Sequence, residues 1–243
     1  MASLANPAHY PASTSEIESL ASRIDFSQIR DSRIAITGSQ GMLGNYLCQV
    51  ALAASQLQGN SPASLISIGR RGLDESQQWA RAVSNFEHHT YGVDFRSTFP
   101  QSDFFLHLAS PASPAKYGSA SAIWESNVGG VVAAISAATP TSRILFLSSG
   151  EVYGAGSPTG FGTSDQPKLQ PSGIRSAYPN AKLSSEFLLE GWSRATNGDA
   201  RIARLFHTFG AGFSLDDGRS FADIITAAAL GRDIKLYSDG SSK

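Results

Sequence analysis

Short apolar runs alternate along this chain with longer segments whose apolar residues recur at helical spacing. The runs have the length and the β-branched or aromatic content of strands buried on both faces. The segments predicted as strands are 34–37, 64–68, 89–93, 103–109, 144–148, 201–206 and 234–237. The segments predicted as helices are 16–29, a stretch from 44 through 54, 74–86, 123–138, 178–195 and 219–230. Strands that alternate with helices are typical of parallel strands joined by right-handed crossovers, so we predict an α/β, doubly wound parallel sheet of the Rossmann type.

Composition and length divide the predicted chain into three parts. Residues 1–30 hold a polar, proline-containing arm and one short helix, residues 31–210 form a dinucleotide-binding Rossmann domain, and residues 211–243 form a small part of a substrate-binding lobe. A hydrophobic content of 41% and a charged content of 16% suit a globular domain with a substantial core. A chain of 243 residues is long enough for one such domain.

The first predicted strand runs into a glycine-rich turn, Thr37-Gly-Ser-Gln-Gly-Met-Leu-Gly44. Gly38 permits the tight turn, Gly41 lets the backbone approach a pyrophosphate, and Gly44 allows the following helix to pack close to the sheet. The start of that helix offers unpaired N–H groups to an anion. The alternative for glycines at this spacing is an ordinary turn, but the preceding strand and the following helix favour nucleotide binding.

The residues after the second predicted strand bear on the choice of cofactor. Arg70 and Arg71 stand where an acidic residue would bind the ribose 2′-hydroxyl of NAD, with Asp74 a little further on. This local charge favours NADP, whereas solvated arginines, or arginines stacked on adenine, would leave NAD as the cofactor. Asp94, after the third strand, could accept a hydrogen bond from the adenine amino group or could simply form a turn.

A set of groups suited to proton transfer follows the fifth predicted strand. Ser149 and Glu151 stand at its carboxyl end, where open α/β sheets bind ligands. Tyr178 and Lys182 are four residues apart and share one face of a predicted helix. An ammonium close to a phenol favours the phenolate, so we expect a lowered tyrosine pKa. Such a tyrosine can take or return a hydroxyl proton while a hydride moves to or from a nicotinamide.

Charge and cysteine content exclude several other classes. The net charge is −1 with no basic run, which argues against a nucleic-acid partner. Cys48 is the single cysteine and lies on the apolar face of a predicted helix, so we expect a buried thiol without a disulfide. No metal site is predicted. The N-terminus lacks the layout of a signal peptide and no segment is apolar enough to span a membrane, so a cytoplasmic location without a membrane partner is expected.

Taken together and in this order, the glycine turn, the serine after strand five and the Tyr-x-x-x-Lys pair resemble the extended short-chain dehydrogenase/reductase family, in its NAD-dependent epimerase/dehydratase branch. The resemblance runs from about residue 34 to residue 243. Its most specific segments are 107–114 (HLASPASP), 149–154 (SGEVYG) and 204–210 (RLFHTFG). They are similar to UDP-glucuronate decarboxylases in particular and, more loosely, to dTDP-glucose 4,6-dehydratases.

The resemblance implies a nucleotide-sugar substrate, bound NAD or NADP, a transient 4-keto sugar and a homodimer whose interface would use the helices at 123–138 and 178–195. In it Tyr178 takes the proton of the sugar C4 hydroxyl, Lys182 holds the phenolate and the nicotinamide ribose, Ser149 binds the C4 oxygen, and Glu151 serves as acid or base near C5. The implied cofactor-binding residues are Gly38, Gln40, Gly41, Met42, Leu43, Gly44, Arg70, Asp94, Phe95, Leu108, Ala109, Ser110, Tyr178 and Lys182. The implied substrate-binding residues are Ser110, Pro111, Ser149, Gly150, His207 and Arg219.

The sequence departs from the family pattern at several places. Gly150 stands where decarboxylases have Ser and dehydratases have an Asp that protonates the leaving C6 hydroxyl, which argues against efficient 4,6-dehydration. His207 replaces an expected Asn, and His207, Glu151 and Arg219 could each be ordinary loop, surface or solvated residues. Family members usually continue beyond residue 243, so the substrate lobe is expected to be incomplete. The alternatives are therefore a non-catalytic NAD(P)-binding module and an NADPH-dependent ketoreductase.

Overall fold

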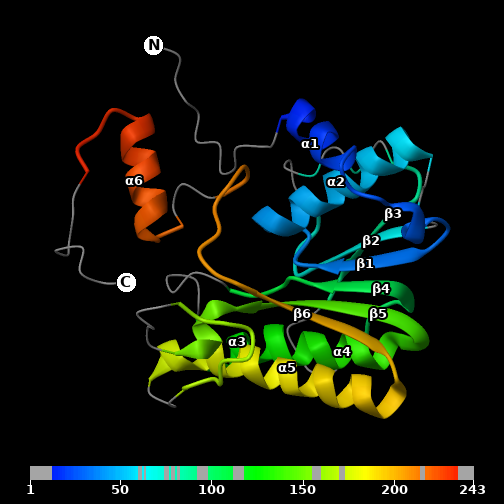
Figure 1. The fold of residues 1–243 in the computed structure, drawn as a ribbon. Coiled ribbons are helices and arrows are strands. Elements are labelled where there is room, and N and C mark those ends of the chain that lie inside the picture. The colour runs from blue at the N-terminus through cyan, green and yellow to red at the C-terminus, as the bar shows by residue number, and fades with distance from the viewer. Residues whose placement is uncertain are drawn as a thin grey trace.

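A computed structural model shows a parallel sheet with helices on both faces (Figure 1). It describes residues 13–59, 62, 64–73, 77, 80, 83–91, 98–111, 118–154, 160–169, 173–213 and 217–234. Six strands pair in the order β3-β2-β1-β4-β5-β6, and every pairing is parallel. Their bounds are β1 Arg33–Thr37, β2 Ser64–Gly69, β3 Phe86–Thr90, β4 Ser102–His107, β5 Ala138–Ser149 and β6 Asp199–Leu205. This strand order reverses between β1 and β4, which is the Rossmann arrangement, so the predicted fold class is confirmed.

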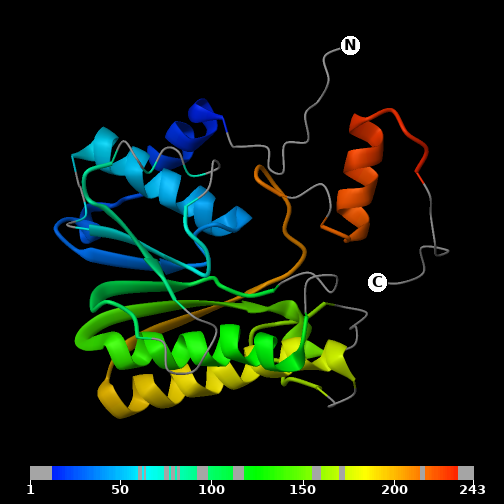
Figure 2. The ribbon, with the colours of Figure 1, turned by 180° about the vertical axis from the view of Figure 1, so that it is seen from behind.

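The helices form one layer on each face of the sheet. Helices α1 (Thr14–Ala21) and α2 (Met42–Gln58) cover one face, and α3 (Ala120–Trp124), α4 (Gly130–Ala137) and α5 (Ala177–Thr196) cover the other (Figures 1 and 2). Helix α6 (Ser220–Ala229) stands apart from both layers, beyond the carboxyl ends of the strands. Short 3-10 turns at Ser27–Ile29, Gly150–Tyr153 and Ile174–Ser176 complete the described elements.

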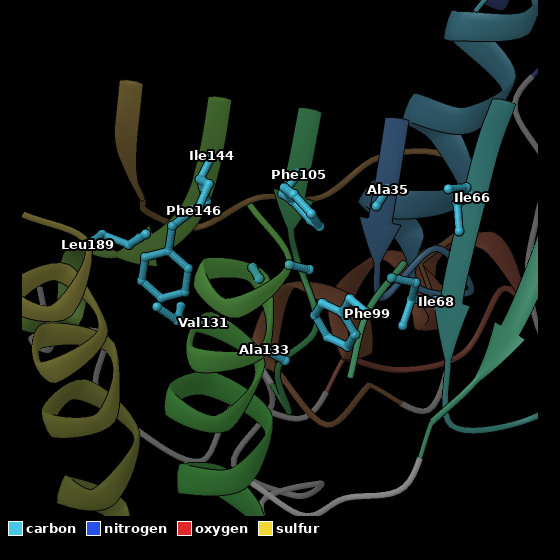
Figure 3. Packing of buried hydrophobic residues seen from close by; sticks show 12 residues of the cluster. Ala35, Ile66, Ile68, Phe99, Phe105, Val131, Ala133, Ile144, Phe146 and Leu189 are labelled. Carbon is cyan, nitrogen blue, oxygen red and sulfur yellow. The ribbon is translucent and has the colours of Figure 1, made fainter. Parts of the chain in front are cut away.

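The main core lies between the sheet and the layer of α4 and α5. Figure 3 shows Phe146 of β5 pointing toward Val131 of α4, with Leu189 of α5 beside it at one end of the cluster and Phe105 of β4 in the middle. Phe105 and Phe146 are completely buried or nearly so. A second cluster joins β1 and β2 to α2, and the Cys48 thiol lies within it. Burial raises the pKa of that thiol to about 12, in keeping with the buried thiol expected from the sequence.

Several predicted boundaries are wrong, mainly where polar residues form regular structure. Strand β3 covers Phe86–Thr90 rather than 89–93, and the helix predicted over 74–86 does not reach Phe86. The edge strand β3 pairs with β2 alone, so it does not require the apolar run by which the inner strands were located. The helix predicted at 16–29 ends at Ala21, and the Asp25 carboxylate then accepts the backbone N–H of Ser27 at 2.8 Å. Residues 235–237 of the last predicted strand lie outside the described part of the chain.

The long helix predicted at 123–138 is interrupted by one wide turn. It begins at Ala120, where the Ser119 hydroxyl accepts the N–H of Ala122, and a π-helical turn at Glu125–Gly129 separates α3 from α4. A π turn inserts an extra residue and redirects backbone carbonyls from the regular helical ladder. The Asn127 carbonyl of this turn faces His107 at the end of β4, so the irregular turn lies beside the carboxyl edge of the sheet.

Candidate active site

The glycine turn between β1 and α2 is built so closely that side chains could not be added to it. Gly38 has a φ of +69°, and a Cβ there would lie 2.8 Å from the backbone of Ala109. A Cβ on Gly44 would lie 2.2 Å from the Gly38 carbonyl oxygen. Helix α2 begins at Met42, and Gly41 before it provides no side-chain cap in the described part of the chain. The turn therefore presents backbone N–H groups at the carboxyl edge of the sheet, as the sequence predicts for a phosphate-binding turn.

Tyr178 and Ser149 meet at the carboxyl end of β5. Ser149 is the last residue of β5, and its hydroxyl accepts the N–H of Glu151 at 3.2 Å, which starts the turn at Gly150–Tyr153. Tyr178 is in the first turn of α5 and is only 6% exposed. Burial raises the pKa of the Tyr178 phenol, with a hydrogen bond from Ser149 opposing this, the Glu151 charge adding to it and the Arg219 charge opposing it. The lowered tyrosine pKa expected from the sequence is therefore wrong for this chain, because desolvation exceeds the favourable contacts.

Lys182 lies one turn further along α5, in the interior of the protein. Its ammonium donates to the Leu147 carbonyl at 2.6 Å and lies 4.7 Å from the ring centre of Phe146 and 5.8 Å from that of Tyr178. The side chain is almost fully buried. Burial lowers its pKa from 10.5 to about 7, and the Glu186 carboxylate opposes this fall. The sequence thus brings phenol, ammonium and Ser149 hydroxyl together as predicted, but the ammonium is held by the sheet backbone.

A buried ion pair supports this group and was not found from the sequence. Glu186 accepts a hydrogen bond from the Ser148 hydroxyl and three from the Arg204 guanidinium, the shortest at 2.7 Å. Arg204 of β6 also lies 4.7 Å from the ring centre of Tyr153. This pair links α5 to β5 and β6, and its carboxylate supplies the negative charge that favours the Lys182 ammonium. The signal was the four-residue spacing of Lys182 and Glu186 on one helix face.

A second buried network ties the glycine turn to β4 and the π turn. The Thr37 hydroxyl oxygen accepts the N–H groups of Leu108 and Ala109, both at 3.1 Å, and approaches His107 Nδ1 at 2.6 Å. His107 Nε2 faces the Asn127 carbonyl at 3.2 Å. Because a carbonyl only accepts, Nε2 carries the proton and Nδ1 accepts from Thr37. Burial, reinforced by the Lys182 charge, lowers the pKa of His107 to about 3, so the ring is neutral and fixed in one tautomer.

The remaining predicted site residues fall into three groups. Ser110 lies after β4, and its buried hydroxyl is close enough to the Tyr178 phenol to act on it, lowering the pKa of that phenol against the larger effect of burial. Gln40 donates from Nε2 to the Gly72 carbonyl at 2.6 Å, and Arg70 is exposed next to Tyr91, whose pKa burial raises and Arg70 lowers. The third group lies near the ends of strands, and its contacts within the chain do not indicate what it binds. Its members are Met42, Leu43, Leu108, Ala109, Pro111, Gly150 and the exposed Glu151 and His207.

Arg219, predicted to contact a diphosphate, is engaged within the chain. Its guanidinium forms an ion pair with Asp217, with Nη2 3.0 Å from one carboxylate oxygen, and lies 4.7 Å from the ring centre of Phe221. Asp94 and Phe95 lie outside the described residues. The described residues contain no group of three or more potential metal ligands. Among the described helices, none is both long and apolar enough to cross a membrane.

Comparisons with known proteins agree with this geometry. The model of the NAD-dependent epimerase/dehydratase family matches residues 34–243. UDP-glucuronic acid decarboxylase 6 of Arabidopsis thaliana is 30% identical over 212 residues, which cover 86% of this chain and 60% of the relative. Among solved structures, dTDP-glucose 4,6-dehydratase from Streptomyces venezuelae with NAD bound has a TM-score of 0.70 at 21% identity, covering 86% of this chain and 66% of that one.

A second solved structure, UDP-glucuronic acid 4-epimerase from Bacillus cereus in complex with UDP-glucuronic acid and NAD, has a TM-score of 0.65 at 19% identity and covers 86% of this chain and 67% of that one. The chain spans about half the length of the curated relatives it matches, from 46% to 60% in the first two. The match extends across the glycine turn, the Ser149–Tyr178–Lys182 group and the segment after β6. The chain belongs to the NAD-dependent epimerase/dehydratase family.

Proposed function

We propose that this chain modifies a nucleotide sugar through a transient 4-keto intermediate with bound NAD or NADP, and that decarboxylation of a UDP-glucuronate-like substrate is its favoured reaction. The observation that carries the proposal is the convergence of the Tyr178 phenol, the Ser149 hydroxyl and the buried Lys182 ammonium at the carboxyl edge of the sheet. Similarity to UDP-glucuronic acid decarboxylases supports the choice of substrate class.

The residues at the switch between β1 and β4 fit a dinucleotide. A Cβ on Gly38 or Gly44 would collide with the backbone of Ala109 or of Gly38, so these glycines allow the tight turn and the close start of α2, and Gly41 leaves the backbone bare where a phosphate would lie. The buried Ser110 hydroxyl, beside the Tyr178 phenol, supplies a further polar group at this edge of the sheet. Gly38, Gly41, Met42 and Leu43 would hold the pyrophosphate, and Lys182 with Tyr178 would hold the nicotinamide ribose. A bound dinucleotide supplies reversible acceptance of the C4 hydride.

Tyr178 and Ser149 have complementary parts in the oxidation of C4. Tyr178 takes the proton from the C4 hydroxyl, and the Ser149 hydroxyl donates to the C4 oxygen as the C4–O bond becomes a carbonyl. Because burial raises the tyrosine pKa, the phenolate needs nearby positive charge, and Lys182 is the buried cation beside it. Glu186 favours the charged form of that lysine. The four groups thus work as one acid–base unit.

The 4-keto sugar then loses its C6 carboxylate. A ketone at C4 makes the C6 carboxylate that of a β-keto acid. The C5–C6 bond therefore breaks and carbon dioxide leaves, while the electron pair of that bond forms a C4–C5 enolate. A proton returns to C5, and the exposed Glu151 beside Tyr178 is the group proposed to deliver it. Return of hydride to C4 and of the Tyr178 proton to the C4 oxygen completes a pentose with no net oxidation.

Incubation of the protein with NAD+ and a panel of UDP-, dTDP-, GDP- and CDP-sugars, followed by mass spectrometry, tests the proposal. We expect loss of carbon dioxide from UDP-glucuronate, and we expect Tyr178→Phe to lower turnover by at least about a hundredfold while leaving the dissociation constant for NAD+ within about threefold. Tyr46→Phe removes a phenol on α2 that bonds Glu16, on the face of the sheet opposite to α5, and should leave turnover unchanged. Full activity in Tyr178→Phe would refute the acid–base assignment. Cofactor binding without product from any sugar would identify a non-catalytic binding module instead.

We further propose NADP as a competent cofactor and a homodimer as the assembly. The exposed Arg70 and Arg71 at the end of β2 favour a 2′-phosphate, whereas the two structural neighbours described above contain NAD. Calorimetric titration with each dinucleotide decides between them. Phe187 on α5 is 62% exposed, beside the partly exposed Leu188, which supports packing of α5 against a second copy. Sedimentation velocity at micromolar concentration tests this assembly.

A further inference from the structure

His88 of the edge strand β3 connects two parts of the proposed cofactor site: the glycine turn, through Ser67 and Ser39, and the arginine segment at the end of β2. His88 pairs with Ser67 in the parallel register of β3 and β2. Its Nδ1 lies 2.9 Å from the Ser67 hydroxyl, and that hydroxyl lies 2.5 Å from the hydroxyl of Ser39 in the glycine turn. Ser39 and Ser67 are completely buried. On its other side, His88 Nε2 lies 2.8 Å from the backbone carbonyl of Arg71.

The direction of these hydrogen bonds is fixed by the Arg71 carbonyl. A carbonyl oxygen only accepts, so His88 Nε2 carries a proton and donates to it. In the neutral ring Nδ1 is then an acceptor, the Ser67 hydroxyl donates to it, and the Ser39 hydroxyl donates to Ser67. One uninterrupted series of donors therefore runs from the glycine turn through β2 and β3 to the backbone carbonyl that follows the second arginine.

The segment Arg70–Gly72 is held at three points, and His88 provides one of them. The Tyr91 N–H donates to the Gly69 carbonyl at 3.0 Å, directly before the segment, and Gln40 Nε2 donates to the Gly72 carbonyl at 2.6 Å. The space is narrow: a Cβ on Gly69 would lie 2.7 Å from Gln40 Oε1 and 3.4 Å from the His88 ring. Among the described residues, His88 is the side chain that holds the Arg71 carbonyl, directly after the second of the two exposed arginines.

We propose that His88 is a positioning residue: by holding the Arg71 carbonyl it fixes the two-arginine segment at the end of β2 and thereby sets how strongly the chain prefers NADP over NAD. The part concerning the dinucleotide rests on the proposed function. Arginine binds a 2′-phosphate through paired, directional hydrogen bonds, so its affinity depends on how well its backbone is fixed. NAD lacks that phosphate and depends mainly on the glycine turn, so its affinity should change little.

Two substitutions separate the hydrogen bond to Arg71 from the rest of the side chain. In His88→Asn the amide oxygen can replace Nδ1 as the acceptor for Ser67, but the side chain is too short to reach the Arg71 carbonyl. In His88→Gln the terminal amide nitrogen can replace Nε2 and donate to that carbonyl. His89→Asn is the matched control, because His89 is the next residue of the same strand, is exposed, and contacts Glu87 at 3.3 Å.

Trypsin measures the anchoring directly, without any cofactor, because it cleaves after Arg70 and Arg71. Loss of one hydrogen bond of about 1 kcal/mol, or about fivefold in an opening equilibrium, should make cleavage at these two sites about fivefold faster in His88→Asn. His88→Gln and His89→Asn should stay within about twofold of the parent. Cleavage after the exposed Arg194 at the end of α5 gives an internal reference for each variant, and thermal unfolding confirms that each is folded.

Calorimetric titration with NADP and NAD then tests the consequence for the cofactor. We expect the NADP dissociation constant of His88→Asn to rise about fivefold relative to that of NAD, and His88→Gln to restore the parent ratio. Parent-like cleavage after Arg71 in His88→Asn, or a His88→Gln variant that behaves like His88→Asn in both assays, would overturn the inference. A parent protein that binds neither dinucleotide would contradict the proposed function and with it the cofactor part of this inference, whereas the cleavage rates would still decide whether His88 holds the segment.

Discussion

Replacing Lys182 with methionine should stabilise the free protein, and the gain should depend on pH. The lysine ammonium is buried beneath the site, where it contacts the Leu147 carbonyl and the faces of Phe146 and Tyr178. Methionine has nearly the same length, keeps the contact with the aromatic rings and removes the charge. It also leaves the Leu147 carbonyl without its donor, which costs about 1 kcal/mol at every pH.

The size of the effect follows from the lysine pKa. A fall from 10.5 in the unfolded chain to about 7 in the folded one means that, at about 1.4 kcal/mol per pH unit, burying the ammonium costs about 5 kcal/mol. The cost is fully present below pH 7, where both states bind the proton. It declines between pH 7 and 10.5, where only the unfolded state binds the proton, and it vanishes above. At pH 6 the cost is therefore about 5 kcal/mol, and at pH 9.5 about 1 kcal/mol remains.

Urea unfolding of the parent and of Lys182→Met at pH 6 and at pH 9.5 measures this difference. We expect the free energy of unfolding to favour the methionine variant by about 3 to 4 kcal/mol more at pH 6 than at pH 9.5. Lys168→Met, at an exposed lysine, should give the same small change at both values. If the effect of Lys182→Met were equal at the two pH values, the ammonium would not be desolvated in the folded chain and the assignment of its burial would be refuted.

Two glycines of the site give further predictions. Gly44→Ala places a Cβ 2.2 Å from the Gly38 carbonyl, so it should lower the free energy of unfolding by about 2 to 3 kcal/mol and abolish dinucleotide binding. Gly191→Ala, in open space on α5, should instead raise the free energy of unfolding by about 0.5 to 1 kcal/mol. Urea unfolding measures the stability of both variants, and calorimetry measures their dinucleotide binding. Gly150→Ser, toward the decarboxylase pattern, places a Cβ 2.5 Å from the exposed Phe206 ring and should cost about 1 kcal/mol. That cost should disappear against a Phe206→Ala background, and additive effects in this double-mutant cycle would contradict the clash.

The inner strands could be predicted from the sequence because burial on both faces demands apolar residues there. Phe105 of β4 and Phe146 of β5 belong to such runs, and both are core residues. Strand β3 could not be placed in the same way, because an edge strand has one neighbour and can contain residues such as Glu87, His88 and His89. The predicted helix ended at Phe86 and the predicted strand began at His89, so Glu87 and His88 fell between the two, and the contact between His88 and the arginine segment could not be predicted.

The candidate site likewise has residues that could be predicted from the sequence and properties that only the fold shows. Tyr178, Lys182 and Ser149 could be identified because their spacing and order are fixed relative to strands that the apolar pattern locates. The pKa of the tyrosine could not, because it depends on how much water is excluded around the phenol, and no spacing reports that quantity. Glu186 was missed for a related reason: a carboxylate four residues after a lysine on a helix is usually a solvated surface pair, and only the fold shows it buried against Arg204.

Lys182 and Glu186 together show how burial of the site, rather than exposure at the surface, changes the charge of the lysine and its effect on the phenol. An exposed lysine would keep its ammonium without help, but water would screen its charge and weaken its effect on a neighbouring phenol. Burial strengthens that effect and at the same time disfavours the ammonium, which would remove the charge altogether. Glu186, which is held by Arg204 and by the Ser148 hydroxyl, opposes this fall in the lysine pKa. The ion pair between α5 and β6 is therefore a support that offsets part of the fall in the lysine pKa that burial causes.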